Sequence, residues 1–117
     1  MPIDDPASLE LLPDNDLRTL VQQSSELSDA IFVSNPRYAE DSGFEPFSAD
    51  WIRRYCKSLL SEISGKPLDK ALEWALAATA MDVSAALVSH FGIVAAAHPA
   101  VIALAILLLR AARETNK

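Results

Sequence analysis

One apolar, alanine-rich segment limits the possible folds of this chain: LDKALEWALAATAMDVSAALVSHFGIVAAAHPAVIALAILLL, residues 68–109. From position 74 to position 109 it contains one acidic residue, Asp82, two histidines, His90 and His98, and no Lys or Arg. A helix made of such residues has no continuous polar face, so it is not stable in water by itself. The stretch must therefore be buried by the rest of the chain, by a second copy or by a lipid bilayer.

Length and composition predict one folded domain over residues 1–117. A chain of this length buries roughly two thirds of its unfolded surface around a single core. Half of the residues are apolar and only three are glycine, which excludes a disordered chain. We divide the domain into an acidic N-terminal part (1–47), a helical core (48–113) and a polar tail (114–117).

The cysteine content and the first residues predict a cytoplasmic protein, with membrane association as the alternative. Cys56 is the single cysteine, which excludes an internal disulfide and fits a reducing compartment. The first five residues, MPIDD, lack the cationic and apolar segments of a secretory signal.

The net charge of −6 conceals an asymmetry between the two halves of the chain. Residues 1–50 contain eleven acidic residues and two arginines, a balance of −9, whereas residues 51–117 contain eight basic and five acidic residues, a balance of +3. The acidic half would repel a phosphate backbone, so we expect no nucleic-acid partner. We expect the two halves to attract each other and the acidic one to form a solvated surface.

Hydrophobic periodicity predicts an all-α fold, a compact bundle of four to five helices. A short helical turn ends at Pro13, and apolar residues at helical spacing predict one continuous, one-sided helix over 17–31. Another one-sided helix begins at Ser48 and ends at Gly65. The segment 34–47 between them is predicted to be an aromatic loop in which Asn35-Pro36 can start one turn of helix through Ala39. Either this loop is functional, or Phe44 and Phe47 pin it to the core.

The last two helices are predicted to form an apolar hairpin at the core of the bundle. The helix over 68–90 has apolar residues nearly all round, so we expect it to be the central one, and Gly92 ends it. The last helix runs from Pro99 to Arg113; if it begins at Ile93 instead, Pro99 kinks it. Because two one-sided helices are too few to cover this hairpin, we expect an exposed apolar patch and self-association.

Asp82 is the residue that points to an interface. A lone acid on an apolar helix needs a partner, so we expect it to pair with His90 or a basic residue of the helix after Ser48, or to face a partner protein. The candidate interface residues are Asp82, Leu104, Leu108, Trp74 and Met81.

A second candidate site is a basic patch made of Arg53, Arg54 and Lys57. These cations lie beside Trp51 and Tyr55, a combination that suits a phosphate or an acidic peptide. The alternative is a solvated face that pairs with the acidic half of the chain.

No residue pattern indicates catalysis or metal binding. His90 lies eight residues from both Asp82 and His98, whereas ligands on one helical face are three or four residues apart. Cys56 falls on the apolar stripe of its helix, which predicts a buried side chain. We therefore expect no enzyme activity, no catalytic residue, no metal and no cofactor.

The function predicted from the sequence is a non-enzymatic helical interaction module that forms a homo-oligomer or docks another helical protein. One alternative is a membrane-inserting or tail-anchored hairpin, because residues 93–109 form an uncharged run of 17 residues, the lower limit for a membrane span. Another is a carrier that holds a small apolar ligand between the helices.

Overall fold

The computed structural model describes residues 6–40, 43–93 and 98–115, and every regular element in these ranges is an α-helix. This confirms the all-α class. The radius of gyration is 12.8 Å, close to the roughly 13 Å of a globular chain of this length, which confirms a compact bundle. The described ranges form the segments α1 (Pro6–Leu9), α2 (Asp14–Gln23), α3 (Ser25–Ser34), α4 (Arg37–Glu40), α5 (Ala49–Ser64), α6 (Leu68–Ala77), α7 (Ala80–Phe91) and α8 (His98–Thr115).

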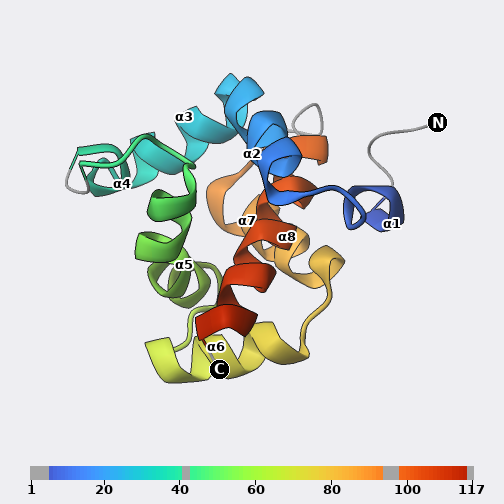
Figure 1. The fold of residues 1–117 in the computed structure, drawn as a ribbon. Coiled ribbons are helices and arrows are strands. Elements are labelled where there is room, and N and C mark those ends of the chain that lie inside the picture. The colour runs from blue at the N-terminus through green and yellow to red at the C-terminus, as the bar shows by residue number, and fades with distance from the viewer. Residues whose placement is uncertain (1–5, 41–42, 94–97, 116–117) are drawn as a thin grey trace.

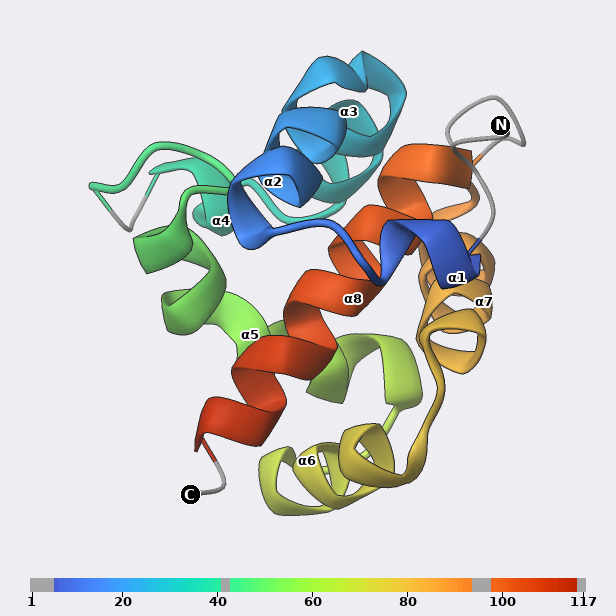
Figure 2. The same cartoon turned by 45° about the vertical axis from the view of Figure 1, so that its right-hand side comes forward.

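The central helix is α8, and not the segment 68–90 as the sequence suggested. Every residue from Ala100 to Leu109 is buried, and so are Ala111 and Ala112. Helices α1, α2, α5, α6 and α7 all contact α8. Figure 1 shows α8 running through the middle of the molecule with α5 beside it and α6 below, and Figure 2 shows α1, α2 and α7 around its other sides. The chain itself therefore supplies the apolar surroundings that α8 requires.

The segment expected to be one helix over 68–90 is broken at Thr79 into α6 and α7. The Thr79 backbone is extended, with φ −92° and ψ 167°, and its Oγ1 accepts the N–H of Asp82 at 3.2 Å. The Asp82 carboxylate accepts the N–H of Thr79 at 3.0 Å in return. This reciprocal capping box begins a new helix, so α6 lies across the base of the bundle while α7 runs along α8 (Figure 1).

The helix expected over 17–31 is also broken, here at Ser24. Its backbone has φ −95° and ψ 103°, and its Oγ accepts the N–H of Leu27 at 3.2 Å, which starts α3. The break allows α2 to pack on α8 through Leu17 and Val21, while α3 turns away toward α4 and α7. These two breaks, together with the one-turn α4 inside the segment predicted to be a loop, explain why the described residues contain more helices than four or five.

Helix α5 follows the sequence prediction at both ends. The Oγ of Ser48 accepts the N–H of Trp51 at 3.2 Å, and Gly65 ends the helix with φ 71°. Phe47 is buried as expected. The centroid of its ring lies 5.3 Å from the centroid of the Phe32 ring and 4.8 Å from that of the Trp51 ring. Phe44 is 40% exposed, so Phe47 is the residue that pins this segment to the core.

Helix α8 is described from His98 to Thr115 with Pro99 in its first turn, and Ile93 is not helical, so the alternative of a helix that begins at Ile93 was wrong. Helix α8 continues to Thr115, two residues beyond the expected end, so Glu114 and Thr115 of the polar tail are helical; residues 116–117 lie outside the described ranges. Over the described residues, no helix combines the length and the apolar character needed to cross a membrane.

The burial of α8 predicts a large difference between two apolar positions. Leu108→Ala should lower the free energy of unfolding by about 2–5 kcal/mol, because it leaves a cavity beside a side chain that is fully buried. Met81→Ala, at a residue that is 52% exposed, should change it by no more than about 0.5 kcal/mol. Urea unfolding followed by circular dichroism measures both, and equal effects would contradict the central position of α8.

Candidate functional site

Two of the candidate interface residues, Leu104 and Leu108, are fully buried inside the chain. Both belong to α8, and the Cys56 thiol on α5 lies 3.4 Å from the Leu108 carbonyl oxygen, to which it donates. Neither side chain offers surface to a second molecule. The sequence placed them at an interface because it did not show that five other helices of the same chain surround α8.

The other three candidates lie on α6 and α7 and do not form one site. Met81 is 52% exposed, whereas Trp74 is half-buried and lines a shallow hollow at the turn between α5 and α6. Asp82 is bonded to Thr79 in the capping box, so the expectation that it pairs with His90 or a basic residue was wrong. The spacing of Thr79 and Asp82, a T-x-x-D pattern, is the signal that identifies this cap in the sequence.

His90 is paired with Glu62, which the sequence did not indicate. Its Nε2 lies 2.7 Å from one carboxylate oxygen of Glu62, and the other oxygen accepts the Tyr38 hydroxyl at 2.9 Å. A carboxylate only accepts, so His90 carries a proton on Nε2. Burial, and after it the hydrogen bond to Glu62, raises the pKa of the Tyr38 phenol well above its ordinary value. The three side chains connect α4, α5 and α7.

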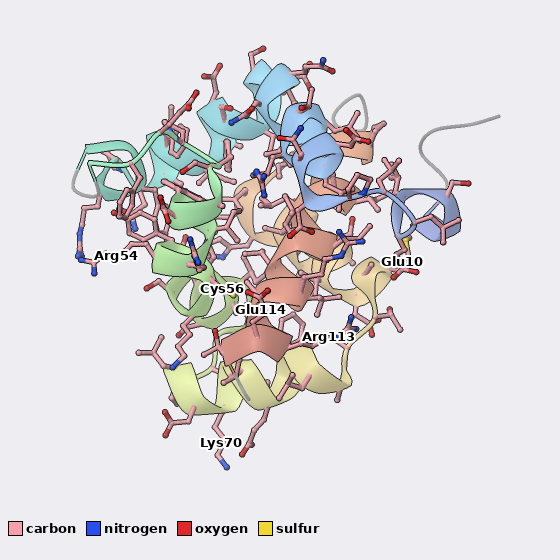
Figure 3. The ribbon with its side chains drawn as sticks, viewed as in Figure 1. Glu10, Arg54, Cys56, Lys70, Arg113 and Glu114 are labelled. Carbon is pink, nitrogen blue, oxygen red and sulfur yellow. The ribbon has the colours of Figure 1, made fainter. Side chains whose placement is uncertain are left out.

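The basic patch is exposed, but its aromatic neighbours are not part of that surface. Trp51 and Tyr55 are buried, whereas Arg53, Arg54 and Lys57 face the solvent. Arg53 is 2.6 Å from the carboxylate of Asp50 one turn earlier. Figure 3 shows Arg54 extending away from α5 at the edge of the molecule. The patch is therefore a surface of cations without aromatic rings, in which Arg53 is already paired with Asp50.

An ion pair between residues far apart in the chain connects the oppositely charged halves. The Arg110 guanidinium on α8 lies 2.6 Å from the Asp14 carboxylate at the start of α2, and it also donates to the Glu10 carbonyl oxygen at 2.9 Å. These contacts hold the segment between α1 and α2 against α8. This ion pair is therefore one part of the attraction expected between the two halves, and it lies between α8 and the start of α2.

A shallow, open groove that the sequence did not identify lies between α3 and the end of α7. We call it the α3–α7 groove; its volume is about 640 Å³. Val33 is 80% exposed there, and Ala30 and Phe91 are half-buried. The lining residues are Glu26, Asp29, Ala30, Val33, Ser34, Phe91, Gly92 and Ile93, so the groove combines apolar side chains with two carboxylates and no cation.

Within residues 6–40, 43–93 and 98–115, no three His, Cys, Asp or Glu side chains come together as metal ligands do. The Cys56 side chain is buried, and burial raises the pKa of its thiol from an ordinary value of 9.0 to about 12. The side chain of His98 lies outside the described residues.

Comparisons with family models, with curated proteins and with solved structures found no match to this chain. Any functional conclusion therefore depends on its own surface.

The raised pKa of Cys56 predicts that stability falls in alkaline solution. The unfolded thiol ionises near pH 9 and the folded one near pH 12, so this contribution is complete below pH 9 and is lost as the pH rises through 12. Between pH 8 and pH 10 the free energy of unfolding should fall by about 1 kcal/mol more in the native chain than in Cys56→Ala. Urea unfolding at both pH values measures the difference. Alkylation of native Cys56 at pH 8 as fast as a free thiol would refute the burial.

Proposed function

We propose that this protein is a non-enzymatic helical interaction module whose docking surface is the α3–α7 groove. The observation that carries the proposal is the groove itself, in which an aliphatic side chain, Val33, stands 80% exposed beside the half-buried Phe91 and two carboxylates. An apolar centre with a polar rim is the usual arrangement of a protein–protein interface. The partner is a second copy of the chain or another helical protein.

The sequence predicted association through the apolar hairpin, whereas the proposed surface is the α3–α7 groove. Because α8 is buried by its own chain, its leucines have no contact area left for a partner. Other exposed apolar side chains, such as Leu11 and Met81, are not part of a groove with Val33. The membrane hairpin and the apolar-ligand carrier remain hypotheses from the sequence, and no feature of the described residues favours either.

A single substitution at Val33 tests the proposal. Val33→Asp places a third acid in the groove, which should prevent an apolar contact there but leave the fold intact, because the side chain is already exposed. Leu11→Asp is the matched control, since Leu11 is 86% exposed and lies outside the groove. Light scattering over a concentration series measures self-association. Amide NMR shifts measure binding of a probe peptide, an amphipathic helix with leucines on one face and lysines on the other.

We expect self-association or peptide binding in the native chain and in Leu11→Asp, and neither in Val33→Asp. The peptide should shift the amide signals of residues 26–34 and 91–93. A native chain that stays monomeric and shows no peptide shifts would refute the proposed function. Equal binding by the two variants would do the same.

A further inference from the structure

Among the charged side chains of the described ranges that have no ion-pair partner are two acids on α3 and two cations on α5. Glu26 and Asp29 form the acidic rim of the α3–α7 groove, and Arg54 and Lys57 lie on the outer face of α5. Within residues 6–40, 43–93 and 98–115, none of these four has an ion-pair partner within 4.0 Å, in contrast to Arg53. The two α5 cations are not among the residues that line the groove. The folded chain thus keeps complementary charges apart.

The spacing of the two pairs is the same. Glu26 and Asp29 are three residues apart on α3, and Arg54 and Lys57 are three residues apart on α5. On a helix this separation places the two Cβ atoms roughly 5–6 Å apart on one face. Two helices laid side by side therefore form both ion pairs at once, whichever way they run.

The groups beside these charges also fit each other. Ala30 and Val33 follow the acids along the groove side of α3, and Ser58 follows Lys57 on the exposed face of α5. A small serine lets the two helices approach closely. The aliphatic stems of Arg and Lys cover apolar side chains while their charged ends reach nearby carboxylates.

We infer that the occupant of the α3–α7 groove is the outer face of α5 from a second copy of this chain. This inference rests on the proposed function and specifies the partner. Arg54 and Lys57 of one molecule pair with Glu26 and Asp29 of the next, and their stems cover Val33. Because two different surfaces meet, association is heterologous and either closes into a ring or extends with concentration. Exposed charge pairs are screened by salt, so association weakens as ionic strength rises.

Charge reversal on either surface tests the pairing. The double variant Arg54→Glu/Lys57→Glu lowers the formal charge by four, from −6 to −10, and Glu26→Lys/Asp29→Lys raises it by four, to −2. All four positions are exposed, so both variants should keep native helix content by circular dichroism. Each variant alone should associate about tenfold more weakly than the native chain, because two attractive pairs become repulsive.

The decisive sample is an equimolar mixture of the two double variants. In the mixture, the acidic α5 face of one variant meets the basic groove of the other, so association should return to the native level. Both variants are net negative, hence overall charge does not drive this recovery. Lys66→Glu/Lys70→Glu is the matched control: it also has a charge of −10 but leaves the α5 face unchanged, and it should associate like the native chain.

Light scattering and sedimentation at low and high salt measure these masses. Recovery in the mixture together with native behaviour of the control supports the inference. A monomeric native chain, a mixture that does not associate, or double variants that associate normally would overturn it. If the probe peptide still binds in a Val33-dependent manner, the proposed function survives that result; if Val33→Asp changes nothing, the proposed function fails as well.

Discussion

The structure depends on one constraint: α8 has no polar face over Ala100–Leu109 and must be covered on every side. A helix with such a surface is normally found in the middle of a large core. Here a chain of 117 residues meets the requirement by placing five other helical segments against it. The alanines at 103, 105 and 112 are fully buried, and their small side chains let these neighbours approach closely. The positions of α1, α2, α5, α6 and α7 all follow from this need.

Short polar side chains make this arrangement possible because they cap new helices at the points where the chain changes direction. Ser24 and Thr79 each use a hydroxyl to cap a new helix, so the chain changes direction where periodicity alone would continue straight. Asp82, which would be costly inside an apolar interface, belongs to one of these caps and is exposed. Arg110 then holds the segment between α1 and α2 against α8 through Asp14 and the Glu10 carbonyl. Polar residues thus determine where the helices begin, and apolar residues form the contacts between the helices.

The same arrangement determines which surface is left for a partner. Because the most apolar helix is covered internally, the surface contains isolated apolar side chains and separate groups of charge. Val33 is exposed beside Phe91 because α3, freed by the break at Ser24, turns toward the end of α7. The cations of α5 are exposed because its apolar stripe, with Trp51 and Tyr55, packs inward. We therefore attribute the function to what the burial of α8 leaves uncovered.

Local caps and hydrophobic periodicity specify the all-α class, both ends of α5, the helical segment that follows His98–Pro99 and the burial of Cys56 and Phe47. These features could therefore be predicted before the fold was known. The cap at Thr79 is also present in the sequence as a T-x-x-D pattern. It was not predicted because the apolar residues on both sides of it indicate one continuous helix. The sequence did not reveal that α8 is the central helix or that the chain itself covers Leu104 and Leu108. Nor did it reveal that His90 meets Glu62 or that Val33 and Phe91 share a groove. Each of these depends on contacts between residues far apart in the chain, whose mutual orientation is set by how the helices pack and not by any local pattern.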